Sequence, residues 1–99
     1  MNILSKRKFA KPEKQFCPGY FWIWRYPLVK ERLIAQLREM YRNGVRSICI
    51  HPSPKGWMPD SGMTPDYLTS AYWSILRAVV AECARLDMNF WLYDEGGYP

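Results

Sequence analysis

The sequence predicts an α/β fold with parallel strands, in the order strand, helix, strand, helix, strand. Apolar and aromatic runs at residues 20–24, 45–50 and 88–93 are typical of strands that are covered on both faces. Between them, residues 29–43 and 70–86 place apolar side chains at helical spacing. Because strands and helices alternate at short intervals, we expect a parallel sheet with right-handed crossovers.

Length and composition limit the classes of protein. The chain has 99 residues, enough for one small domain at most, and its 48% hydrophobic and 16% aromatic content excludes a disordered chain. No apolar stretch approaches the length of a membrane span, which is about 18 residues. The basic amino-terminal segment lacks the apolar stretch of a signal peptide. We therefore expect a cytoplasmic protein with no membrane partner, unless its true start has been lost.

Residues 1–19 are expected to form a basic tail and lead-in. Residues 1–16 contain five basic side chains and only Glu13 as an acid, so most of the net charge of +5 belongs to the tail. Such a tail is typically a solvated arm. The lesser alternative, weak nucleic-acid attraction, predicts a steep salt dependence that disappears when residues 1–16 are removed. Because the rest of the chain is almost neutral, we expect no nucleic-acid partner.

Cysteine spacing gives no sign of a metal site. Cys17, Cys49 and Cys83 are far apart in the sequence and form neither a metal knuckle nor a CxxC redox motif. We expect buried, reduced thiols that pack as small apolar side chains, and no protein metal site.

The first strand is expected at Tyr20–Trp24, after turn residues at 17–19. Trp22 and Trp24 share one face because strand side chains alternate. Core packing is favoured for Trp22, whereas Trp24 suits either the core or a stacking surface for a sugar ring. The helix at 29–43 buries a stripe centred on Leu33, Leu37 and Met40, with Gly44 as its left-handed terminator.

The second strand, residues 45–50, should stop at His51-Pro52, because proline cannot donate to a ladder. A long loop follows, and Thr69 is the expected N-cap of the helix at 70–86. The apolar stripe expected on that helix, broadened by its last two members, consists of Trp73, Leu76, Val80, Cys83, Tyr72 and Val79. Asp87 stands where glycine would end the helix more easily.

Candidate site residues lie at the carboxyl ends of the strands, where binding groups gather in parallel α/β sheets. These ends hold Trp24-Arg25, His51 and Asp94-Glu95. His51 suits a hydrogen bond to a substrate hydroxyl or proton donation, although a structural histidine is equally consistent. Asp94 and Glu95 point opposite ways if extended, so they are not a ready acid and base pair.

Two further features accompany these strand ends. The loop aromatics Trp57 and Tyr67 either form a wall of the site or hold the loop in place. Gly96-Gly97 lacks the spacing of a phosphate-binding loop, which argues against nucleotide binding.

Residues 20–99 resemble a known family. The matching segments are Phe21-Trp22-Ile23-Trp24, Gln36-Leu37-Arg38-Glu39-Met40, Asn43-Gly44-Val45, Ile50-His51-Pro52, Tyr67-Leu68-Thr69, Tyr72-Trp73 and Trp91 to Pro99. Together they are similar to the start of the catalytic barrel in α-L-rhamnosidases of glycoside hydrolase family 106 and in related bacterial glycosidases. The segment from Trp91 to Pro99 is the most specific. Asp87 and Gly97 depart from the pattern, and neither is a proposed sugar-facing position.

The resemblance implies the first three strands and two helices of a TIM (β/α)8 barrel. It implies hydrolysis of O-glycosidic bonds of terminal sugars by two carboxyl groups, which we expect on strands beyond residue 99. Trp24, His51, Asp94 and Glu95 would then bind substrate, and calcium is implied by the family alone. A closed barrel needs about 250 residues, so we expect a fragment that is inactive without the remainder of the barrel. The alternative is a small non-catalytic α/β domain that binds carbohydrate or protein.

Overall fold

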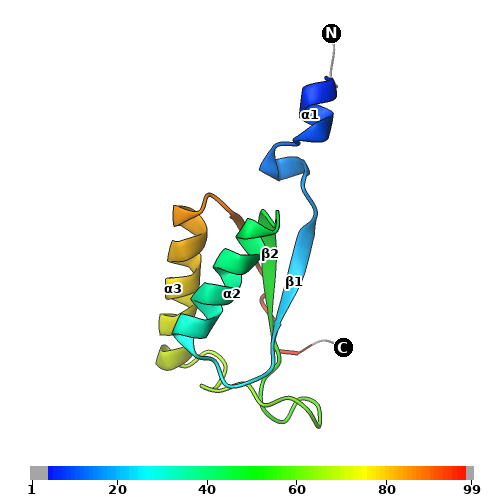
Figure 1. Cartoon of the computed structure of the whole chain (residues 1–99). Coiled ribbons are helices and arrows are strands. Elements are labelled where there is room, and N and C mark those ends of the chain that lie inside the picture. Colours follow the sequence, from blue (N-terminus) through cyan, green and yellow to red (C-terminus); the bar gives the residue numbers. More distant parts are fainter. Residues whose placement is uncertain (1–4, 98–99) are drawn as a thin grey trace.

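The computed structural model describes residues 5–97 as a three-stranded parallel sheet with two packed helices and an extended amino-terminal segment (Figure 1). Its elements in chain order are α1 (Lys6–Ala10), the 3-10 turn η1 (Lys14–Phe16), β1 (Gly19–Trp24), α2 (Lys30–Arg42), β2 (Ser47–Pro52), α3 (Ser70–Arg85) and β3 (Asn89–Leu92). The predicted α/β class, the parallel sheet and the order of its strands and helices are confirmed. Parts of the predicted tail and of the last loop, residues 1–4 and 98–99, lie outside the described residues.

The sheet has the order β1-β2-β3, and every pairing is parallel. Phe21 of β1 lies opposite Cys49 of β2, which in turn lies opposite Trp91 of β3. Helices α2 and α3 lie side by side on one face (Figure 1). The other face, here called the open face, carries the alternate residues Phe21, Ile23, Cys49, His51, Trp91 and Tyr93.

The hydrophobic core lies between the sheet and the two helices. Ile48 and Ile50 of the central strand are 0% and 3% exposed and meet Leu37 of α2 and Val79 of α3, which are fully buried. Burying a branched side chain of this size contributes about 1.5–3 kcal/mol. By contrast, no helix among the described residues covers the open face, where Trp91 remains 62% exposed.

Helix α3 begins as predicted but buries a slightly different stripe. Thr69 Oγ1 accepts a hydrogen bond from the backbone N–H of Tyr72, which confirms the N-cap. The predicted stripe members Trp73 and Val80 are 39% and 37% exposed, whereas Tyr72 and Val79 are buried. The buried face of α3 is therefore shifted by one residue, from Trp73 and Val80 to Tyr72 and Val79. This shift follows from the packing of α3 beside α2.

The prediction that β2 stops before His51 is wrong. The strand continues to Pro52, which lies opposite Trp24 at the end of β1. The missing N–H of Pro52 is tolerated because it lies at the last strand position, where the next N–H, of Ser53, donates to Trp24 O at 2.9 Å. Pro52 O accepts from Gly97 N at 2.8 Å, so its acceptor is also used.

The described part of the basic tail, from residue 5 onwards, is largely exposed, as expected of a solvated arm, but it is partly helical. Helix α1 has no buried residue, and Ser5 caps it by accepting a hydrogen bond from Lys8 N. The tail meets the body through Lys14 Nζ, which lies 2.7 Å from Asp87 Oδ1. The described residues contain no helix long and apolar enough to cross a membrane.

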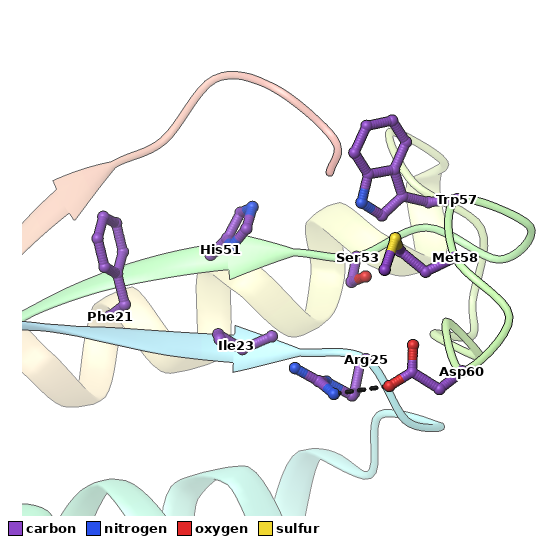
Figure 2. Close-up of a pocket in the computed structure, with 8 residues that line it drawn as sticks. All are labelled: Phe21, Ile23, Arg25, His51, Ser53, Trp57, Met58 and Asp60. Atoms are coloured by element: carbon purple, nitrogen blue, oxygen red, sulfur yellow. Dashed lines mark hydrogen bonds and ion pairs between the residues drawn. The ribbon is translucent and has the colours of Figure 1, made fainter. Parts of the chain in front are cut away.

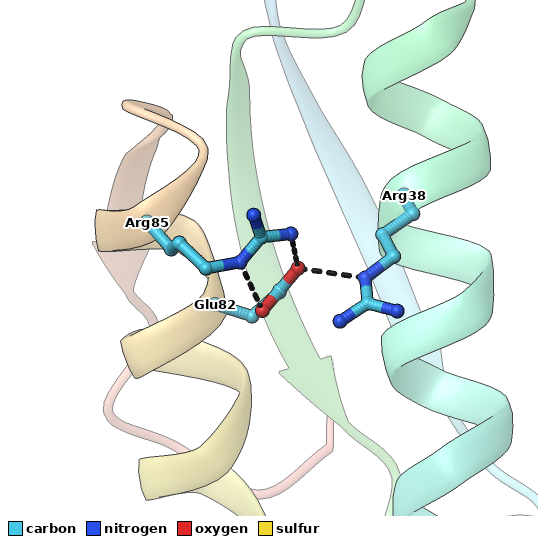
Figure 3. A network of polar contacts seen from close by, with 3 residues as sticks. All are labelled: Arg38, Glu82 and Arg85. Carbon is cyan, nitrogen blue, oxygen red and sulfur yellow. Dashed lines mark hydrogen bonds and ion pairs between the residues drawn. The ribbon is translucent and has the colours of Figure 1, made fainter.

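A buried carboxylate joins the two helices. Glu82 of α3 is 8% exposed, and its side chain accepts hydrogen bonds from Arg85 on the same helix and, at 2.8 Å, from Arg38 Nε of α2 (Figure 3). These two guanidinium groups lower the pKa of Glu82 to about 2. Helical periodicity marks position 82 only as a neighbour of the apolar stripe, so the sequence did not predict this contact.

We expect Glu82→Gln to reduce the free energy of unfolding by about 1–2 kcal/mol at pH 7, because two charge-assisted hydrogen bonds are weakened. Since folding lowers the pKa of Glu82 from 4.5 to about 2, its stabilisation is complete above pH 4.5 and is lost as the pH falls towards 2. Urea unfolding at pH 7 and pH 3 measures the difference between the two proteins, which should shrink at pH 3.

Glu39→Gln is the matched control for this experiment. Glu39 makes an ion pair with Arg42 on the surface of α2, where both side chains are about two-thirds exposed, and such pairs contribute little. A destabilisation by Glu39→Gln equal to that of Glu82→Gln would contradict a special role for the contact between the helices.

Asp87 adopts the left-handed conformation that the sequence led us to expect after α3, with φ 56°. Aspartate is strained in this conformation, whereas glycine is not. The ion pair between Asp87 and Lys14 is exposed and therefore contributes little to stability. We expect Asp87→Gly to raise the free energy of unfolding by about 0.5–1 kcal/mol, measured by urea titration. Asp87→Asn keeps a side chain and removes the charge, so equal losses in both variants would show that the ion pair dominates.

Candidate functional site

A hollow of about 400 Å³ opens at the carboxyl ends of β1 and β2, between the open face and the loop that follows β2 (Figure 2). Its walls combine apolar and polar side chains, namely Phe21, Ile23, Trp57, Met58, Arg25, His51, Ser53 and Asp60. Its position agrees with the rule that parallel α/β sheets place binding groups at the ends of the strands.

Strand alternation places one wall of the hollow. Phe21 and Ile23 lie two residues apart on β1 and therefore point to the same open face. Ile23 is opposite His51 of β2, so the parallel pairing brings these two side chains together. Phe21 is 63% exposed, which leaves most of its ring available for contact.

Hydrogen bonds fix the loop at residues 53–69 against the strand ends. Gly62 N donates to Arg25 O at 2.7 Å, and Leu28 N donates to Thr64 O at 2.8 Å. Because these bonds join the returning half of the loop to the segment after β1, they hold the outer wall of the hollow beside the strand ends.

Two buried serines close the base of the same loop. The hydroxyls of Ser53 and Ser61 are 2.7 Å apart, and each residue is 8% exposed. Ser61 Oγ also accepts from Met58 N at 3.1 Å. The hydroxyl pair therefore satisfies the polar groups that the loop buries, and it places Met58 and its neighbour Trp57 over the hollow.

An ion pair lies at one end of the hollow. Arg25 Nη1 and Asp60 Oδ2 are 2.8 Å apart, with side chains 36% and 63% exposed (Figure 2). Phe21 lies at the opposite end. The hollow thus has an aromatic end and a charged end whose charges balance.

His51 lies inside the wall of the hollow at 9% exposure. Its ring makes an edge contact with Tyr93, with centroids 4.8 Å apart, and a tilted contact with Phe21 at 6.1 Å. The structure therefore brings His51 into the hollow that the strand ends were expected to form.

Trp24 lies in the core, which is one of the two roles that the sequence left open; the other was a stacking surface for a sugar ring. It is 2% exposed, and its ring makes edge contacts with Trp22 at 5.5 Å and with Tyr72 of α3 at 6.2 Å. Strand alternation turns both tryptophans of β1 towards the helices, away from the open face. The ring of Trp24 is therefore not exposed for stacking on a sugar.

Asp94 and Glu95 follow β3 and are exposed outside the lining of the hollow. Glu95 Oε1 accepts a hydrogen bond from Tyr93 Oη at 3.1 Å. Burial, and then the nearby charges of Asp94 and Glu95, raise the pKa of Tyr67. The two carboxylates thus lie near the loop aromatic Tyr67 and outside the lining of the hollow.

Gly96 and Gly97 are packed tightly beneath the loop. A Cβ atom on Gly96 would lie 2.7 Å from Pro54 Cγ and 2.9 Å from the Tyr67 ring. A Cβ atom on Gly97, where φ is 91°, would lie 2.5 Å from Trp57 Cδ2. Trp57 and Tyr67 therefore both fix the loop against the end of β3, and Trp57 also lines the hollow, whereas Tyr67 does not.

The three cysteines are free thiols, and only Cys83 is fully buried. Burial, with the charge of Glu82, raises the pKa of Cys83 to about 11, and burial also raises the pKa of Cys49. Within residues 5–97 no group of three His, Cys, Asp or Glu side chains is placed to hold a metal ion. These residues therefore do not supply a side-chain set for the calcium that the resemblance implies.

No family model, curated protein or solved structure matches this chain.

Several residues of the hollow were not singled out in the sequence. Ser53 and Asp60 lie in a loop whose path no local pattern predicts, and Arg25 was noted only as a strand end. Phe21 and Ile23 could have been found from alternation, because they share the face that Trp22 and Trp24 do not occupy.

We expect Gly97→Ala to displace Trp57, because the new methyl group would overlap the indole. The indole resonance of Trp57 in a 1H–15N spectrum should shift, and the unfolding midpoint should fall. Gly44→Ala is the control, since Gly44 has a similar φ of 96° but no heavy atom within 4 Å of its built Cβ. An unchanged Trp57 resonance in Gly97→Ala would contradict the close packing.

Proposed function

We propose that this chain forms part of a (β/α) barrel of a glycoside hydrolase, similar to the α-L-rhamnosidases of family 106, and that the hollow is part of its sugar pocket. The observation that carries the proposal is the hollow at the strand ends, whose lining combines aromatic rings with hydrogen-bonding groups. The resemblance of residues 20–99 gives the class of sugar, a terminal deoxyhexose, and the reaction, hydrolysis of an O-glycosidic bond.

The arrangement of strands and helices supports a barrel as the parent fold. The strands are neighbours in chain order, and both helices lie on one face (Figure 1). In a (β/α) barrel the helices form an outer ring and the opposite face of the sheet turns inward. The open face would then become the interior, which gives its apolar side chains a partner.

The chemistry of the walls suits a pyranose ring. A sugar presents an apolar C–H face, which packs on aromatic rings, and a rim of hydroxyls, which need donors and acceptors. Trp57 is 43% exposed beside the hollow, and Phe21 is exposed at its far end. Arg25, Ser53 and Asp60 supply polar groups for the rim.

Glycoside hydrolysis requires two carboxyl groups across the scissile bond. Among the described residues, Asp60 is the single carboxylate that lines the hollow, and it is paired with Arg25, while Asp94 and Glu95 lie outside the lining. We therefore assign substrate binding to the described residues and place the catalytic pair on strands of the barrel beyond residue 99. The remainder of the barrel is the partner that this proposal requires.

The alternative is a non-catalytic α/β domain that binds carbohydrate or protein. The observation that favours it is the exposure of Phe21 and Trp91, which are 63% and 62% exposed on the open face. The opposite face of the same sheet is already packed against two helices. Such a domain would unfold cooperatively alone and would bind its ligand without any further strands. The glycosidase proposal instead requires that the reading frame beyond residue 99 encode further strand and helix units.

We expect Trp57→Ala to weaken binding of methyl α-L-rhamnoside about tenfold, because the sugar loses an aromatic wall. Chemical-shift titration at millimolar sugar measures the dissociation constant. Trp73→Ala is the control, since Trp73 is similarly exposed on α3 and does not line the hollow. We also expect no hydrolysis of aryl rhamnosides by the 99-residue chain.

Two results would contradict this proposal. One is a wild-type chain that binds no sugar at millimolar concentration, and the other is equal weakening by both tryptophan variants. Hydrolysis of an aryl rhamnoside clearly above background would contradict the assignment of catalysis to residues outside this chain.

A further inference from the structure

We infer that the hollow selects an uncharged sugar by two adjacent hydroxyls, which the Arg25–Asp60 ion pair binds together, and that it rejects a uronate. This inference rests on the proposed function and names the substrate class of the same site. Among the described side chains that line the hollow, Arg25 is the one arginine or lysine and Asp60 the one carboxylate. Because they are paired at 2.8 Å, their charges cancel.

The pair has donors and acceptors left for a ligand. Guanidinium carries five N–H donors, and a carboxylate has two oxygens, each with more than one lone pair. The contact between residues 25 and 60 uses Nη1 and Oδ2 only. Neither side chain makes another hydrogen bond within residues 5–97, so the remaining guanidinium donors and Asp60 Oδ1 are available.

Adjacent hydroxyls match this pair in geometry and in polarity. Their oxygens lie about one hydrogen-bond length apart, as do Nη1 and Oδ2. One hydroxyl can accept from the guanidinium of Arg25 while its neighbour donates to the carboxylate of Asp60. Both new bonds are charge-assisted, and neither partner loses its counter-charge.

A carboxylate ligand is disfavoured by the same pair. To reach Arg25 it must displace Asp60 or lie beside it, which places two negative groups at one end of the hollow. If the ligand carboxylate lies beside Asp60, the two negative charges repel each other. If it displaces Asp60, the Asp60 carboxylate loses its partner Arg25. The hollow would therefore bind a deoxyhexose in preference to a uronate of similar size.

The chain holds Asp60 in place by contacts that do not involve its charge. Its neighbour Ser61 is buried against Ser53, and the next residue, Gly62, donates its N–H to the carbonyl of Arg25 itself. The backbone thus sets the separation of the two side chains. Removing the carboxylate charge should leave the loop in position.

Chemical-shift titration of three probes tests the inference. The probes are methyl α-L-rhamnoside, its 2,3-O-isopropylidene derivative, in which the adjacent hydroxyls are blocked, and sodium galacturonate. We expect the wild-type chain to bind the free rhamnoside at least about tenfold more tightly than either of the others. The blocked derivative lacks the two hydroxyls that the site would hydrogen-bond, and the carboxylate of galacturonate is repelled by Asp60.

Asp60→Asn should reverse the charge preference. It leaves Arg25 without a counter-ion, so we expect rhamnoside binding to weaken about tenfold and galacturonate to become the tighter ligand. Arg25→Lys keeps the charge but loses the forked donors, so it should weaken rhamnoside binding without favouring galacturonate as strongly. Asp66→Asn is the matched control, because Asp66 lies in the same loop outside the hollow and should leave all three constants unchanged.

The outcomes separate this inference from the proposed function. If sugar binds but galacturonate equals the rhamnoside in the wild type, or if Asp60→Asn leaves the preference unchanged, the inference is overturned and the sugar pocket stands. Equal binding of the blocked and free rhamnosides overturns it in the same way. If none of the probes binds, the proposed function is overturned and this inference with it.

Discussion

The fold depends on the central strand β2, the one strand of the described sheet that has a partner on both edges. Its residues serve the two faces in turn: Ile48 and Ile50 are buried under the helices, while Cys49 and His51 lie on the open face. The strand therefore joins the core to the hollow. A shift of β2 by one residue would exchange the faces, placing His51 beneath the helices and the isoleucines on the open face.

The one-sided cover of the sheet explains two other features. Because both helices pack on a single apolar layer, a polar group buried between them needs hydrogen-bond partners. Glu82 has two such partners, Arg38 and Arg85. On the opposite side the open face meets the loop at residues 53–69, and the hollow forms where the two converge. The contacts between the helices and the candidate site thus lie on opposite faces of the same sheet.

The sequence predicted what local pattern determines. Periodicity placed the strands and helices, Thr69 and Gly44 marked helix ends, and strand order placed His51 near the site. It did not determine which stripe of α3 is buried, because that choice depends on packing beside α2. It did not find Asp60 either, since the bond between Gly62 and Arg25 joins segments far apart in the chain.

The buried hydroxyl pair of Ser53 and Ser61 has a kinetic consequence. Because this pair and the bond from Gly62 to Arg25 hold residues 53–62 of the loop against the strand ends, the hollow is already shaped before a ligand arrives. Little conformational entropy remains to be lost on binding, and no closing motion must precede it. Association at this site should thus be limited by diffusion and orientation, and differences in affinity between ligands should appear in their dissociation rates.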